Sequence, residues 1–224
     1  MSINYECIMR YFFLRIVQLL LVVTLCWKMS AQELSGDVRS VYDICLRMRS
    51  AIEVGSNTAL KAAGKALAEC NVGNFGTLRS IGQEPLSIDG HFVFDDVFVD
   101  SLVAGRNVYR FSKKYAEEQA KRGVSGGGDV LIKNAAVSAE SSVRYSFPSK
   151  GRQELAVVTE PGGLVTLRVY DKSNGKWYND TEDVNAGRAS RFMVIDLPDD
   201  KRNLLELEII NRSGKDISFV IIGN

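Results

Sequence analysis

The sequence predicts an α+β protein in which a helical N-terminal part precedes a C-terminal antiparallel β-sandwich of jelly-roll type. Three observations predict this order. An apolar stretch near the start has the form of an export signal. Apolar residues then recur at three- and four-residue spacing up to about residue 70, as in amphipathic helices. After residue 142, short β-rich runs alternate with turn residues, as in a sandwich.

The first 31 residues follow the order of a secretory signal peptide. Arg10 and Arg15 precede the apolar run 16–27, and the small residues of Ser30-Ala31-Gln32 come after it. The apolar run is shorter than the ~20 residues that span a membrane. The Ser-Ala-Gln junction resembles the export signals of Bacteroidetes. We therefore expect cleavage after Ala31 and a mature chain in the periplasm, on the cell surface or outside the cell; a retained anchor is the alternative.

The mature chain is expected to carry little net charge. The full sequence has 28 Lys and Arg and 27 Asp and Glu, and removal of residues 1–31 leaves a net charge of about −1. Binding to nucleic acid depends on clustered Lys and Arg that release counterions. We therefore expect no nucleic-acid partner, and no membrane span once the signal is removed.

Two helices are predicted over residues 37–53 and 58–70, on either side of the turn Val54-Gly55-Ser56-Asn57. Cys45 and Cys70 lie on these helices, and they are the cysteines that remain after signal cleavage. An antiparallel hairpin brings them near each other, and an oxidising compartment favours their pairing. We predict a structural disulfide; a metal site or a redox couple is the alternative, without CxxC spacing or a histidine cluster to support it.

The chain divides into four predicted segments. They are the signal peptide at 1–31, a mainly helical domain with a short β element at 32–124, a Gly-containing linker with the first strand at 125–141, and the sandwich domain at 142–224. Two short strands are expected within 85–106 and a further helix near 108–119. Ser125-Gly126-Gly127-Gly128 lacks the GKS/T continuation of a phosphate-binding loop, so we interpret it as a linker.

The sandwich domain is predicted to contain six strands after the first one. They are expected at 143–147, 154–159, 164–170, 191–197, 204–211 and 217–222. Leucine and isoleucine alternate with glutamate from Leu204 to Ile210, which is typical of a strand with one wet face. Glu160-Pro161-Gly162-Gly163 predicts a tight turn, because Pro fixes its second position and Gly permits a positive φ at its third.

The last eighty or so residues resemble the bacterial pre-peptidase C-terminal domain. The resemblance is carried by Tyr145-Ser146-Phe147, the run 164–171, Asp196-Leu197-Pro198 and the closing strands 207–211 and 218–222. That family is a small jelly-roll-like sandwich appended to secreted proteins. The resemblance therefore implies a jelly-roll domain in an exported protein, and the N-terminal part resembles no family.

Residues of catalytic type gather at one place. His91, the single histidine, lies near Asp89, Asp95, Asp96 and Asp100. Neither a nucleophile elbow nor EF-hand spacing accompanies them, so we interpret the acids as turn and solvated positions. We predict no catalytic residues, no metal site and no cofactor, and a hydrolase with a site near His91 ranks third among the functional hypotheses.

A candidate ligand site is formed by Tyr170 and the run Trp177-Tyr178-Asn179-Asp180 in a turn-rich stretch after a strand. Aromatic rings stack on sugar faces, and amide and carboxylate groups bond to sugar hydroxyls. We therefore expect an exported, non-catalytic module that binds a glycan or surface polymer through its sandwich loops. The alternative is a structural or assembly protein of the bacterial envelope that binds an envelope protein. Burial of Trp177 in the core would favour that alternative.

Overall fold

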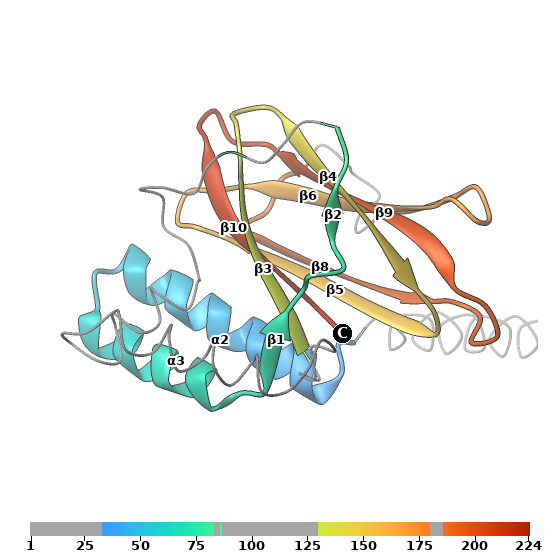
Figure 1. The fold of residues 1–224 in the computed structure, drawn as a ribbon. Helices are drawn as coiled ribbons and strands as arrows, with labels where there is room; N and C mark the ends of the chain where they lie inside the picture. The colour runs from blue at the N-terminus through green and yellow to red at the C-terminus, as the bar shows by residue number, and fades with distance from the viewer. Residues whose placement is uncertain (1–32, 83–85, 87–129, 180–185) are drawn as a thin grey trace, which may run out of the picture. The chain divides into compact units, whose positions relative to one another are not determined.

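The computed structural model describes residues 33–82, 86, 130–179 and 186–224. Two five-stranded sheets pack face to face, and two helices lie against the outer face of one of them (Figure 1). The α+β class and the β-sandwich are therefore confirmed. Within the described ranges, neither helix is long and apolar enough to cross a membrane.

The two helices form the predicted hairpin. They are α2 (Gly36–Glu53) and α3 (Asn57–Glu69), and their buried residues recur at helical spacing. Gly55 adopts a φ of +69° in the turn between them, a conformation that glycine tolerates without strain. The Ser56 hydroxyl then caps α3 by accepting a hydrogen bond from the Ala59 N–H at 3.3 Å.

Ten strands are present in the described residues. They are β1 (Val72–Asn74), β2 (Arg79–Ser80), β3 (Val130–Val137), β4 (Ser142–Ser149), β5 (Arg152–Thr159), β6 (Val165–Asp171), β7 (Lys176–Asn179), β8 (Ser190–Asp196), β9 (Asn203–Asn211) and β10 (Ile217–Gly223). Sheet A has the order β1-β3-β10-β5-β8, and sheet B has the order β2-β4-β9-β6-β7. Strands β3 to β10 are distributed over the two sheets as in a jelly roll, and only β1 and β3 pair in parallel. The six strands predicted from the sequence correspond to β4, β5, β6, β8, β9 and β10.

The turn between β5 and β6 has the predicted geometry. Gly162 adopts a φ of +80°, and the Gly163 N–H donates to the Glu160 carbonyl at 3.0 Å. Pro161 precedes this glycine at the second position. These features define a type II turn.

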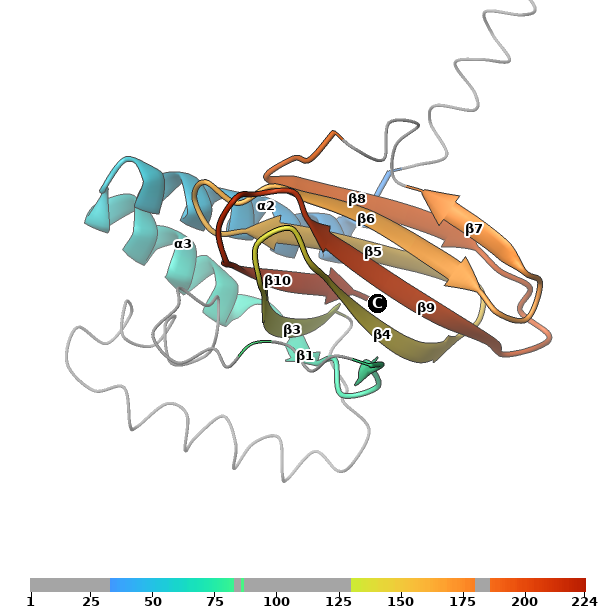
Figure 2. The same ribbon diagram turned by 90° about the horizontal axis from the view of Figure 1, so that it is seen from above.

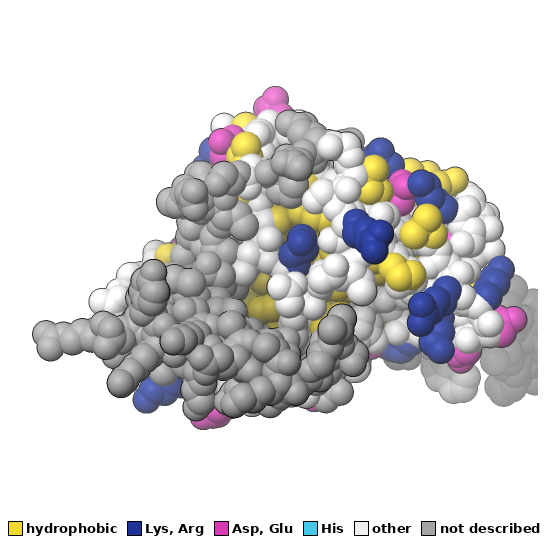
Figure 3. Space-filling view, in the orientation of Figure 1, with side chains coloured by type: hydrophobic (Ala, Val, Ile, Leu, Met, Phe, Trp, Pro, Cys, Tyr) yellow, Lys and Arg dark blue, Asp and Glu magenta, His cyan; other side chains and the backbone are white. Residues whose placement is uncertain are grey.

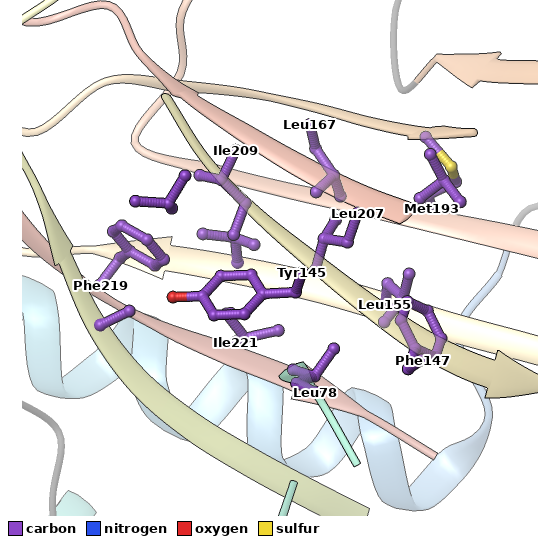
Figure 4. Packing of buried hydrophobic residues seen from close by; sticks show 14 of the residues in the cluster. Leu78, Tyr145, Phe147, Leu155, Leu167, Met193, Leu207, Ile209, Phe219 and Ile221 are labelled. Atoms are coloured by element: carbon purple, nitrogen blue, oxygen red, sulfur yellow. The ribbon is translucent and has the colours of Figure 1, made fainter. Parts of the chain in front are cut away.

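Sheet A is apolar on both faces. Its inner face packs against sheet B, and Figure 4 shows Phe219 and Ile221 of β10 among the side chains of that core. Its outer face packs against the helices, through residues such as Val158 of β5 and Val220 of β10. Every residue of β10 is therefore buried, whereas β9 alternates between the core and the outer face of sheet B.

The helices and the sandwich belong to one compact unit, Leu34–Asn224. The boundary predicted at residue 142 separates segments that pack together, because β3 pairs with all of β10 and α2 contacts β5 and β10. Burial of the apolar outer face of sheet A is the physical reason for this arrangement.

A buried carboxylate holds the start of α2 against sheet A. Glu154 of β5 accepts a hydrogen bond from the Ser35 N–H at 2.7 Å and one from Arg152 Nε at 2.8 Å. The Glu154 side chain is buried, and it lies at the positive end of the α2 dipole. Further along α2, the Tyr42 hydroxyl donates to Ser190 Oγ of β8 at 2.9 Å.

Several predicted features lie outside the described residues. They are the signal peptide at 1–31, the strands expected within 85–106, the helix near 108–119, and the linker Ser125-Gly126-Gly127-Gly128. His91 and the neighbouring acids Asp89, Asp95, Asp96 and Asp100 also lie there.

Cys45 and Cys70 are free thiols in the structure, so the predicted disulfide stays a prediction. Cys45 is buried, and Cys70 packs against the same core between the helices and sheet A. Burial and, to a smaller extent, the neighbouring Cys70 raise the pKa of the Cys45 thiol to about 12. Folded protein should therefore react poorly with thiol reagents at Cys45 whether or not the disulfide exists.

We expect Cys45 and Cys70 to be linked in protein recovered from an oxidising compartment. The link would stabilise the fold by roughly 3 kcal/mol in the chain-entropy model. Protein should be unfolded in the presence of an alkylating reagent, because burial protects Cys45 in the folded state, and then mapped by peptide mass without reduction. Alkylation of both cysteines under these conditions would show that the pair is reduced.

The core between the sheets contains one hydroxyl without a hydrogen-bond partner among the described residues, that of Tyr145. Figure 4 shows this side chain lying between Leu207 and Phe219. Burial raises the pKa of the Tyr145 phenol. An unpaired hydroxyl in such a place costs free energy of folding.

Tyr145→Phe should therefore raise the free energy of unfolding by about 1 kcal/mol, because it removes the unpaired hydroxyl and keeps the ring. Tyr42→Phe is the matched control: it removes a hydroxyl that bonds to Ser190, so it should lower the free energy of unfolding by a similar amount. Denaturant unfolding of the two variants measures both changes. A destabilised Tyr145→Phe variant would show that this hydroxyl has a partner.

Candidate functional site

The outer face of sheet B is the face that the described helices leave uncovered, because both helices pack on sheet A. Figure 2 looks down onto sheet B, with β4, β9, β6 and β7 side by side in front of the helices. Side chains of alternate residues on each strand point outward from this face.

Strand register arranges these outward side chains in two rows across the sheet. The first row runs from β2 to β7 through Arg79, Ser146, Glu206, Tyr170 and Trp177. The second row runs from β4 to β7 through Arg144, Glu208, Arg168 and Asn179. With strands about 4.8 Å apart, the first row extends over roughly 19 Å. The rows therefore form an extended platform with an aromatic end on β6 and β7.

Trp177 and Tyr170 form the aromatic end of the platform. Their ring centroids are 4.9 Å apart with an interplanar angle of 36°, and Arg168 Cζ lies 4.7 Å from the centre of the indole ring. Trp177 remains 44% exposed. It is therefore a surface residue and not part of the core.

Trp177 was predicted to lie in a loop, and this prediction was wrong. Lys176–Asn179 forms strand β7, which pairs with β6 in a hairpin. Four residues beside a turn carry too weak a pattern to predict a strand, and pairing with β6 decides the conformation. Trp177 and Asn179, which were expected in a loop, thus lie on a sheet face.

The remaining predicted site residues divide between two faces. Asn179 is exposed and lies on the outer face, opposite Arg168. Tyr178 points the other way and packs against the core between the sheets, with Lys176 Nζ 4.5 Å from its ring centre. Strand alternation separates these neighbours, so Tyr178 is not part of the platform. Asp180 lies outside the described residues.

Two glutamates of β9 organise the basic residues of the platform. Glu206 accepts a hydrogen bond from Arg144 Nη2 at 2.8 Å and forms an ion pair with Lys172, the residue after β6. Glu208 pairs with Arg168 and accepts a hydrogen bond from the Ser142 hydroxyl at 3.2 Å. Both carboxylates are thus engaged by basic side chains, through charge-assisted contacts that fix the positions of those side chains.

The basic residues and glutamates were missed by the sequence analysis. Arg144 and Glu206 are 62 residues apart in the sequence and meet only because β4 pairs with β9. The alternation of leucine and glutamate in β9 was the available signal, since it predicted a wet face. Figure 3 shows several Lys and Arg side chains spread over the part of the molecule where β4 and β9 lie.

Asp171 fixes the hairpin that presents Trp177. Its buried carboxylate accepts hydrogen bonds from the Ser173 N–H at 2.9 Å, from Asn174 Nδ2 at 2.6 Å and from Asn203 Nδ2 at 3.3 Å. The first two bonds close the turn between β6 and β7, and the third ties that turn to β9. An Asp side chain that bonds to the backbone two residues later is typical of tight turns.

In the part of the chain that the structure describes, no group of three or more His, Cys, Asp and Glu residues is placed to hold a metal ion. The platform itself consists of aromatic rings, hydrogen-bonding groups and ion-paired side chains.

No protein-family model matches the chain, and no curated protein matches it. Among solved structures, it is similar to a family GH115 4-O-methyl-α-glucuronidase with specificity for decorated arabinogalactans, at 15% identity over 40% of this chain and 14% of that chain, with a TM-score of 0.22. It is similar to insecticidal crystal protein Cry2Aa, at 18% identity over 44% of this chain and 19% of that chain, with a TM-score of 0.24.

A third similar structure is TmCBM61 in complex with β-1,4-galactotriose, at 12% identity over 42% of this chain and 81% of that chain, with a TM-score of 0.26. TM-scores this low carry no argument about function. The resemblance to the pre-peptidase C-terminal domain stays a prediction.

Asp171→Ala should lower the free energy of unfolding by about 2 kcal/mol, because three donors lose a buried acceptor. The loosened hairpin should also make Trp177 more accessible to a neutral quencher such as acrylamide. Denaturant unfolding and quenching of the chain from Gln32 onward, in which Trp177 is the single tryptophan, measure both effects.

Asp200→Ala is the matched control, since Asp200 is exposed. It should leave stability and quenching within the range of ordinary surface substitutions. Equal behaviour of the two variants would show that Asp171 does not position the hairpin.

Proposed function

We propose that this protein is an exported, non-catalytic glycan-binding module whose site is the outer face of sheet B around Trp177. One observation carries the proposal: the Tyr170–Trp177 pair stands on an uncovered sheet face with the indole ring 44% exposed. An indole ring in that position offers the flat apolar surface on which sugar rings stack.

The surroundings of the pair support the same function. Asn179 and Ser146 lie in the two rows beside the aromatic residues, and their amide and hydroxyl groups can bond to sugar hydroxyls. The pair also belongs to regular strands whose turn is held by Asp171. A stiff platform loses little conformational entropy when it binds a ligand.

The location outside the cytoplasm rests on sequence features. Residues 1–31 have the order of a secretory signal, and the sandwich resembles a domain found on secreted proteins. An exported binding module would meet glycans of the envelope or of the surroundings.

An assembly role finds less support in the described residues. Among the residues that the structure describes, the large hydrophobic ones exposed besides Trp177 are Val54, Leu164 and Leu204. They lie in the turn after α2, between β5 and β6, and on β9. Single exposed hydrophobic residues of this kind are ordinary on a protein surface and do not form a protein-binding patch.

Trp177→Ala should abolish glycan binding while costing less stability than the ~3 to 5 kcal/mol of a buried aromatic residue, because the ring is half exposed. Leu164→Ala is the matched control, as it removes another exposed apolar side chain away from the platform. Both variants should be tested on a glycan array together with the unsubstituted chain from Gln32 onward.

The array hit should then be titrated while the emission of Trp177 is followed. Binding should shift the emission wavelength of Trp177 and lower its quenching by acrylamide, because the sugar replaces water at the indole ring. A hit that survives Trp177→Ala, or an array without any hit, would contradict the proposal.

A further inference from the structure

We propose that the ligand of the platform is an acidic glycan, in which a sugar ring stacks on Trp177 and carboxylate or sulfate groups bind the basic residues of the two rows. This inference rests on the proposed function and adds the chemical class of the ligand.

The basic groups form the outermost layer of the platform. The side chains of Arg144, Arg168 and Lys172 are 44%, 36% and 48% exposed, whereas those of Glu206 and Glu208 are 6% and 12% exposed. The carboxylates therefore lie against the sheet and the cations lie above them. A ligand that binds to this face therefore contacts the basic side chains before the carboxylates.

The platform is also more basic than the rest of the chain. Its two rows and the adjacent Lys172 contain four basic side chains and two acidic ones. The mature chain as a whole has a net charge of about −1. Positive charge is thus concentrated on the same face as the exposed aromatic pair, which favours an anionic partner.

The ion pairs within the platform leave donors for a ligand. Arg144 donates one Nη to Glu206, and Arg168 donates Nε to Glu208. A guanidinium group has five N–H donors in a fixed plane, so each arginine retains donors that match a carboxylate or sulfate group. The ion pairs with Glu206 and Glu208 fix the orientation of the two arginines before a ligand binds.

The aromatic pair and the basic residues of the platform are close enough for one ligand to contact both. Arg168 lies against the indole ring itself, and Arg144 is two strands away in the same row as Arg168, at roughly 10 Å. Arg79 ends the other row and is exposed. An extended chain crossing the strands would touch the aromatic pair at one end and basic residues along its length, a combination that fits acidic sugars.

The test compares probes that differ in charge but share a sugar skeleton. They are oligogalacturonate, the neutral galacto-oligosaccharide obtained by reducing its carboxyl groups, and a sulfated heparin oligosaccharide. A polyglutamate peptide serves as a polyanion without sugar rings. Each is titrated into the chain from Gln32 onward, which retains the compact unit Leu34–Asn224, by calorimetry at two salt concentrations.

We expect at least one acidic oligosaccharide to bind at least about tenfold more tightly than the neutral one, which is the contribution of one charge-assisted hydrogen bond. The preferred probe distinguishes carboxylate from sulfate. Arg79→Gln should weaken acidic binding several-fold and reduce its salt dependence, and Lys172→Gln should do the same, because Glu206 keeps Arg144 as a partner. Lys61→Gln on α3 is the control of equal charge change and should have no effect.

Trp177→Ala separates this inference from the proposed function. Equal binding of neutral and acidic probes that is lost in Trp177→Ala would overturn the acidic ligand and leave the glycan-binding function intact. Acidic binding that is unchanged in Trp177→Ala and matched by polyglutamate would identify general attraction of polyanions and overturn both. Absence of binding to both acidic probes would overturn the acidic ligand.

Discussion

The structure depends on the burial of sheet A on both faces. β5 and β10 are apolar on both sides, so one sheet partner cannot bury them, and a second layer is required. The α2–α3 hairpin supplies that layer through the apolar face of each helix. This burial joins the helices to the sandwich, and Glu154 then aligns α2 by holding its first turn.

Because both described helices cover sheet A, no described element covers the outer face of sheet B. The alternating pattern of β9 suits that position, because Leu205, Leu207 and Ile209 enter the core between the sheets. Glu206 and Glu208 lie on the outer face, where basic side chains cover them. The glutamates would be costly there without partners, and β4 and β6 provide arginines at the matching register. The platform is therefore a product of the same layering that determines the fold.

The sequence predicted the elements with strong periodicity and failed where distant strands had to be matched. Both helices and six strands follow from apolar spacing, while β7 was too short to recognise beside its turn. Tyr170 and Trp177 were predicted as site residues because they are close in the chain. The basic residues and glutamates of the platform were not predicted, since the register of β4, β9 and β6 cannot be read from one sequence. The apolar runs 155–158 in β5 and 219–222 in β10 were the available signal for a sheet buried on both faces, and this signal was missed.

The position of β10 has a consequence for the order of folding. This strand lies between β3 and β5 in the middle of sheet A, yet it is the last strand of the described fold. β3 and β5 cannot be joined until residues 217–223 have been synthesised, so sheet A closes only through contacts between distant parts of the chain. Folds of this kind form slowly. Until β10 is in place, the edges of β3 and β5 that it covers remain open to pairing with other chains.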